Sequence, residues 1–130
     1  MSHSTIAAIA TGTGGGVGMI RLSGPEAFSI AAAVFSPRNP ARDPRTMPGY
    51  TGALGTVQDA AGILDEAVLF IYRAPHSYTG EDVAELSCHG GPFVLSKVLS
   101  ALVAAGAQPA AAGEFTRRAL QNGKMSLTEA

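Results

Sequence analysis

A carboxylate lies at an unusual place in the segment from Ser77 to Pro92, whose sequence is SYTGEDVAELSCHGGP. Residues 83–88 (VAELSC) have the composition of a strand, and Glu85 is in its middle. Burying an unpaired carboxylate costs roughly several kcal/mol, so we expect Glu85 to have a partner. Arg21 is a cation at a similar mid-strand position. Two interpretations are open from the residues alone, a structural Glu85–Arg21 ion pair and a ligand that Glu85 binds.

Cys88 and His89 have the residue types of a nucleophile and its base. Neighbouring residues of a regular strand point to opposite faces, so these two side chains cannot meet. We expect Cys88 to be a buried structural cysteine, and His89 to cap the strand end or to line a pocket. The three histidines and the single cysteine have no spacing typical of metal ligands, so we predict no metal site.

The glycine-rich segment 12–18 (GTGGGVG) does not match a nucleotide-binding loop. It lacks both the Gly-Lys-Ser/Thr ending of a phosphate loop and the G-x-G-x-x-G spacing of a dinucleotide fold. It also leads into a strand, so no helix N-terminus follows it to receive a phosphate. Nucleotide binding by this segment is therefore excluded. A tight turn between strands and a backbone lying close to a flat ligand both fit the residues.

Three further charged residues stand beside a predicted strand or turn. Glu81 and Asp82 lie at the entrance of the Glu85 strand, where we expect them to be solvated or bonded to loop amides. Lys124 is one of only two lysines in the chain and follows a glycine turn, from which its amine could reach a cleft.

The predicted elements that position these residues alternate between strands and helices. Strands are predicted at residues 5–10, 17–23, 50–58, 63–73 and 83–88, and helices at 25–35, 91–106 and 113–120. The run Ala67–Tyr72 is apolar at every position, which predicts a central strand covered on both faces. Residues 36–49 carry four prolines and are predicted to be a surface loop without a regular element. Residues 126–130 begin like a capped helix.

Composition narrows the class of protein. The chain has 130 residues, 46% hydrophobic and 15% charged, which is typical of one compact globular domain. A net charge of −1 provides no overall field that would recruit nucleic acid. One cysteine excludes an internal disulfide and fits a reducing compartment. No apolar run approaches membrane-spanning length and no secretory signal begins the chain, so we expect a cytoplasmic protein without a membrane partner.

Several motifs together carry a resemblance to a known family. They are Val17-Gly-Met-Ile-Arg-Leu-Ser-Gly24, Ser77-Tyr-Thr-Gly-Glu-Asp-Val83, Glu85-Leu86, His89-Gly-Gly-Pro92, Gly113-Glu-Phe-Thr-Arg-Arg-Ala119 and Asn122-Gly-Lys-Met-Ser-Leu127. Their order and their span over nearly the whole chain resemble the N-terminal domain of the tRNA uridine-modifying GTPases called MnmE or TrmE. The opening loop, residues 10–17, is one residue shorter than the usual family form and lacks its proline.

The resemblance implies a fold and a place in a larger protein. The fold would be α+β, a mixed β-sheet with about three helices, similar to the tetrahydrofolate-binding domain of the glycine-cleavage aminomethyltransferase. Residues 1–120 would form a folate-binding and homodimerisation domain, and residues 121–130 the truncated start of a linker or helical domain. Full-length members add a helical domain, a GTPase domain that uses GTP, potassium and magnesium, and a C-terminal cysteine motif. The present segment lacks the GTPase motif, so alone it would hydrolyse no GTP.

The resemblance also implies a cofactor, partners and site residues. The cofactor would be 5-formyltetrahydrofolate or 5,10-methylenetetrahydrofolate, contacted by Arg21, Glu85 and Lys124. The Glu85 carboxylate could accept the two adjacent N–H donors of a pterin, and the two cations would serve a carbonyl or formyl oxygen and the glutamate tail. Tyr78 could offer a ring face, and Gly90 and Gly91 backbone N–H groups. No catalytic residue is predicted within this segment.

The full-length family members form a heterotetramer with an FAD-dependent subunit, MnmG (GidA). Together they add a carboxymethylaminomethyl group to the wobble uridine of certain tRNAs. Two alternatives remain open for this chain. One is a folate-dependent aminomethyl transferase domain without a GTPase, and the other is a purely structural dimerisation module.

Overall fold

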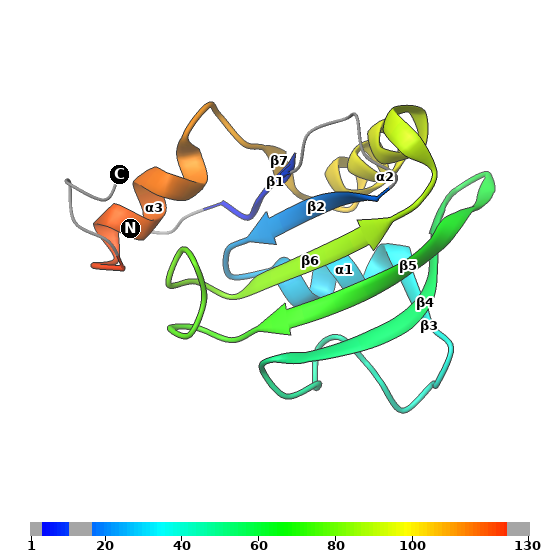
Figure 1. Ribbon diagram of the computed structural model, residues 1–130, viewed down its shortest axis with the longest axis horizontal. Helices are drawn as coiled ribbons and strands as arrows, with labels where there is room; N and C mark the ends of the chain where they lie inside the picture. The colour runs from blue at the N-terminus through cyan, green and yellow to red at the C-terminus, as the bar shows by residue number, and fades with distance from the viewer. Residues whose placement is uncertain (1–3, 11–16, 125–130) are drawn as a thin grey trace.

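The computed structural model describes residues 4–10 and 17–124. The expectations for the glycine-rich segment at 11–16 and for the helix start at 126–130 lie outside the described residues. Within the described ranges the chain forms one seven-stranded sheet with the strand order β3-β4-β5-β6-β2-β1-β7 (Figure 1). The strands are β1 (Ile6–Ile9), β2 (Gly18–Ser23), β3 (Phe35–Pro37), β4 (Thr51–Asp59), β5 (Gly62–Tyr72), β6 (Val83–Cys88) and β7 (Gln108–Pro109).

The described part of the chain also contains three helices, α1 (Ala27–Val34), α2 (Gly91–Ala104) and α3 (Glu114–Gln121). Neighbouring strands are antiparallel except β1 and β7, which are parallel. The predicted α+β class, a mixed sheet with about three helices, is therefore confirmed. The predicted likeness to the aminomethyltransferase domain stays a prediction.

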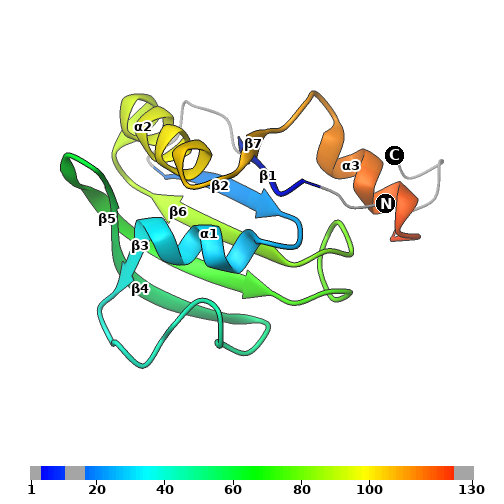
Figure 2. The same ribbon diagram turned by 180° about the vertical axis from the view of Figure 1, so that it is seen from behind.

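Helices α1 and α2 cover one face of the sheet (Figure 2). Alternation along β2 sends Ile20 and Leu22 to this face, where each is 1% exposed, and sends Met19, Arg21 and Ser23 to the other, as predicted. The buried stripe of α2 consists of Leu95, Val98 and Leu102. The hydrophobic core thus lies between the sheet and two helices, and the face that carries Arg21 and Glu85 is turned away from it.

Two short strands occupy the edges of the sheet, and both contain proline. Residues 36–49 were predicted to be a loop, and this is wrong at Ser36 and Pro37. These two residues belong to β3 and pair with Thr56 and Gly55 of β4. Proline is tolerated on an edge strand, where its missing N–H breaks no ladder. Gly55 permits the close approach, since a Cβ there would stand 2.2 Å from the Ser36 carbonyl oxygen. Pro109 has the same edge position in β7.

Strand β5 is central, as predicted, but it is covered on one face only in the described chain. Leu69 faces the helices and is 0% exposed. On the opposite face, which we call the open face, Phe70 is 38% exposed and Leu54 of the adjacent β4 is 40% exposed. The prediction of cover on both faces is therefore wrong for these residues, since α1 and α2 lie on the same side of the sheet.

None of the helices in the described residues combines the length and the apolarity that a membrane crossing requires.

Candidate functional site

The two charged residues of the predicted site lie directly opposite each other. Strands β2 and β6 pair in a register that places Arg21 beside Glu85 on the open face. The Arg21 Nε donates a hydrogen bond to Glu85 Oε2 over 2.9 Å, and the two side chains are 21% and 14% exposed. The ion pair expected under the structural interpretation is therefore present.

Two aromatic rings flank the Arg21 guanidinium. Its central carbon lies 5.4 Å from the centre of the Tyr78 ring and 5.5 Å from the centre of the Phe115 ring. Both distances are in the range of cation–π interactions. The Tyr78 hydroxyl is 2.9 Å from the Thr116 hydroxyl, so the loop after β5 and helix α3 meet beside Arg21.

A hollow of about 370 Å³ opens at this junction. Its charged wall is Arg21, and its aromatic walls are Tyr78 and Phe115. The remaining lining residues are Ala8, Ile9, Ala10, Ala110, Ala111, Ala112, Gly113 and Thr116. We call this the arginine hollow. Its size is at the lower end of the range for small-molecule sites, and its few polar groups among small apolar ones are typical of them.

A second hollow, of about 300 Å³, shares Tyr78 with the first. It is also lined by Tyr50, Tyr72, His76, Ser77 and Lys124, and we call it the lysine hollow. The rings of Tyr50 and Tyr72 meet edge to face with their centres 6.0 Å apart. Burial raises the pKa of the Tyr72 phenol, and the nearby negative charge of Glu85 raises it further. Glu85 thus acts on both hollows, through Arg21 in one and Tyr72 in the other.

The predicted site residues do not all lie in one place. Arg21, Glu85 and Tyr78 are brought together, and Lys124 lines the adjoining hollow. Gly90 and Gly91 follow the C-terminal end of β6, at the start of α2, whereas Tyr78 precedes its N-terminal end. The two glycines line neither hollow. The roles assigned to these residues stay predictions.

The backbone around His89 and Gly90 is bound by a side chain from β5. The N–H groups of both residues donate to the Asp65 carboxylate, over 2.7 and 2.9 Å. This interaction fixes the turn from β6 into α2. Its two glycines need no ligand to explain them, because Gly91 has a φ of +79° and a Cβ at Gly90 would stand 2.5 Å from Val94 Cγ2.

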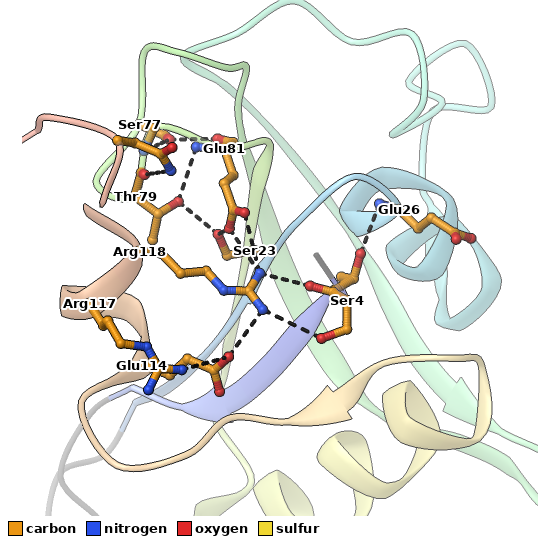
Figure 3. Close-up of polar contacts among 12 residues, drawn as sticks. Ser4, Ser23, Glu26, Ser77, Thr79, Glu81, Glu114, Arg117 and Arg118 are labelled. Atoms are coloured by element: carbon orange, nitrogen blue, oxygen red, sulfur yellow. Dashed lines mark hydrogen bonds and ion pairs between the residues drawn. The ribbon is translucent and has the colours of Figure 1, made fainter. Parts of the chain in front are cut away.

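The sequence did not predict a partly buried ionic cluster beside the site. Arg118 of α3 is 4% exposed and forms an ion pair with Glu81 over 3.1 Å (Figure 3). The expectation that Glu81 is solvated or bonded to loop amides is wrong, because its carboxylate pairs with Arg118 of α3. The expectation for Asp82 is confirmed, since its carboxylate accepts the Ala74 N–H over 2.9 Å. The only sequence signal was the spacing of Glu114 and Arg118, which suits an i,i+4 pair.

Cys88 behaves as a structural cysteine. It is 0% exposed, and burial raises the pKa of its thiol to about 11. Between pH 9 and 11 the unfolded thiol loses its proton while the folded one keeps it, so folding stability should fall as the pH rises through this window. We expect Cys88→Ala to reduce this loss of folding stability with rising pH, as measured by urea unfolding at pH 8, 9 and 10. An equal fall in the variant would contradict a buried neutral thiol.

Comparison with known proteins gives a consistent match over the whole chain. The family model described as "GTP-binding protein TrmE N-terminus" matches residues 5–124. Three relatives, each named tRNA modification GTPase MnmE, come from Bacteroides thetaiotaomicron, Chlamydia abortus and Thermus thermophilus. They are 43%, 47% and 50% identical over 100%, 100% and 96% of this chain. The alignments cover 28%, 28% and 29% of the relatives, so the chain spans less than a third of their length.

Proposed function

This chain belongs to the family of TrmE N-terminal domains, and from this premise we propose that it is the folate-binding and dimerisation domain of a tRNA modification GTPase. The whole protein would hydrolyse GTP, with potassium and magnesium, in a domain outside this chain. With an FAD-dependent MnmG partner it would add a carboxymethylaminomethyl group to the wobble uridine of tRNA in the cytoplasm. This chain would supply the reduced-folate site and a homodimer contact.

The observation that carries the folate proposal is a poorly exposed carboxylate beside two aromatic-walled hollows. The Glu85 side chain is 14% exposed, its partner Arg21 lines one hollow, and Tyr72 lines the other. A reduced pterin is flat and presents adjacent N–H donors, which match aromatic walls and a carboxylate. Its benzoyl-glutamate tail carries carboxylates, which match Lys124 or Arg21. The residues present therefore fit the group, and the bound folate would supply a one-carbon unit.

The dimerisation proposal is supported by the open face of the sheet. Phe70 and Leu54 lie diagonally across the β4–β5 pair on this face and remain 38% and 40% exposed. A second copy that covered them would remove this apolar surface from water and complete the cover of β5 that its sequence predicts.

A purely structural role is the alternative, and one observation favours it. Glu85 already has a partner in Arg21, at 2.9 Å, so the pair could serve the fold alone. Under this alternative the pair needs no ligand, and the chain would bind no folate. The two functions predict opposite outcomes when the chain is titrated with a folate.

Titration calorimetry of the 130-residue chain with 5-formyltetrahydrofolate tests the proposal. We expect saturable binding, and we expect Lys124→Met to weaken it by about three- to tenfold, since one partly exposed charge pair contributes roughly 1 kcal/mol. Lys97→Met is the matched control, because Lys97 lines a different hollow and should leave the Kd unchanged. Absence of saturable heat from the wild-type chain would contradict folate binding and favour the structural role.

A further inference from the structure

Helix α3 carries walls of the candidate site but has little hydrophobic attachment to the domain. Its buried residues are Arg118 and Ala119, and both views place it beyond the β1–β7 edge, away from α1 and α2 (Figures 1 and 2). Phe115 and Thr116 of this helix nevertheless line the arginine hollow. The polar contacts of α3 must therefore fix where these walls stand.

Arg118 joins three segments that are distant in the sequence. Its Nη1 donates to the Ser4 carbonyl oxygen over 2.7 Å and to Glu81 Oε1 over 3.1 Å. Its Nη2 donates to Glu114 Oε2 over 3.1 Å, within the same helix. Figure 3 shows the guanidinium at the centre of these contacts. The planar guanidinium reaches these partners from two separate nitrogens held in fixed directions, whereas an ammonium has a single nitrogen.

The Glu81 end of this cluster fixes the loop that carries Tyr78. Glu81 Oε1 accepts a hydrogen bond from the Ser23 hydroxyl over 2.7 Å, and the Glu81 N–H donates to Thr79 Oγ1 over 3.2 Å. The Ser77 hydroxyl binds the Glu81 carbonyl oxygen and accepts the Gly80 N–H. The loop on either side of Tyr78 is thus bonded to itself and, through Glu81, to Arg118.

The Glu114 end of the cluster fixes the start of α3. The Ala111 N–H and the Arg118 guanidinium both bind the Glu114 carboxylate, and they lower its pKa. None of the buried side-chain polar atoms in residues 4–10 and 17–124 lacks a hydrogen-bond partner. The cluster is therefore complete, and it binds the two segments that carry the aromatic walls.

We infer that Arg118 is a positioning residue that sets Tyr78, through Glu81, and Phe115, through Glu114, on either side of Arg21. It touches neither hollow itself. Its consequence for folate binding rests on the proposed function, whereas its hold on the two walls does not depend on any ligand.

The binding test uses Arg118→Lys, which keeps the positive charge but replaces the planar guanidinium by a single ammonium group. We expect the Kd for 5-formyltetrahydrofolate to rise at least tenfold. Arg117→Lys is the matched control on the same helix, 59% exposed, and should change the Kd less than twofold. Because Arg118 is inferred to act through both aromatic walls, Arg118→Lys should add less than twofold once Tyr78→Ala and Phe115→Ala are both present. An unchanged Kd in Arg118→Lys, or a further loss of tenfold when it is added to those two substitutions, would overturn the inference.

A ligand-free test separates this inference from the folate proposal. In hydrogen exchange followed by mass spectrometry, Arg118→Lys should speed exchange at least tenfold in residues 77–82 and 114–121, with 84–88 unchanged. Unchanged exchange in residues 77–82 would overturn the inference even if folate binds. If Arg118→Lys does not fold, Glu114→Gln replaces it. That variant should speed exchange in residues 114–121 and raise the Kd at least threefold, and wild-type values for both would overturn the inference.

Discussion

Glu85→Gln should weaken binding of 5-formyltetrahydrofolate about 30-fold, with little change in the fold. The amide keeps the shape of the side chain. It also keeps one oxygen that can accept the hydrogen bond from Arg21 Nε, which lies 2.9 Å from Glu85 Oε2 in the wild-type chain. The second oxygen is replaced by an NH₂ group, which donates hydrogen bonds and so cannot accept one from the N–H groups of the pterin. Hydrogen bonds to charged groups contribute about 1.5–3 kcal/mol, and a loss of about 2 kcal/mol corresponds to the expected change in Kd.

The matched control is Glu66→Gln on β5 of the same sheet. The Glu66 side chain is 60% exposed and pairs with the exposed Arg38. This variant removes the same charge from the same sheet and should leave the Kd within twofold. Calorimetry gives the Kd, and urea unfolding shows whether the fold is intact. An unchanged Kd in a folded Glu85→Gln variant would contradict the proposal that the carboxylate binds the pterin.

Leu69→Ala should destabilise the domain by about 3 kcal/mol. Leu69 is 0% exposed at the centre of β5, between the sheet and its two covering helices. Truncating a fully buried leucine removes apolar burial and leaves a cavity, at a cost of about 2–5 kcal/mol. Urea unfolding followed by far-ultraviolet circular dichroism measures this loss, and the single-domain core makes one cooperative transition the expectation.

Leu54→Ala is the control for the core prediction. Leu54 lies on the neighbouring strand β4 but on the open face, where it is 40% exposed. In the monomer, measured at a protein concentration too low for copies to associate, the same truncation should cost less than about 1 kcal/mol, because much of the side chain there contacts water. Equal losses from the two variants would mean that the helix face of the sheet is not the core of the domain.

The strands and helices were largely predictable from local pattern. Period-two alternation assigned Ile20 to one face and Arg21 to the other, and the structure places both as predicted. The edge strands β3 and β7 were not predictable in this way. They are short and contain proline, and they exist because a longer strand lies beside them, which no local pattern records.

The site was predictable only in part, for a physical reason. Glu85 and Arg21 drew attention because charges in the middle of apolar strands need partners. Their facing positions depend on the β2–β6 register, which the sequence suggests but does not set. Glu81 and Arg118 are 37 residues apart, and their contact depends on where α3 lies against the loop. Local composition therefore did not indicate that this loop carboxylate pairs with an arginine of α3 and is only 12% exposed.

A crystal structure of the chain soaked with 5-formyltetrahydrofolate tests the central proposal most directly. We expect the pteridine at the two hollows around Tyr78, with its N–H edge on the Glu85 carboxylate and its tail toward Lys124 or Arg21. Folate bound at another surface, with the Arg21–Glu85 pair and both hollows unchanged, would contradict the proposal.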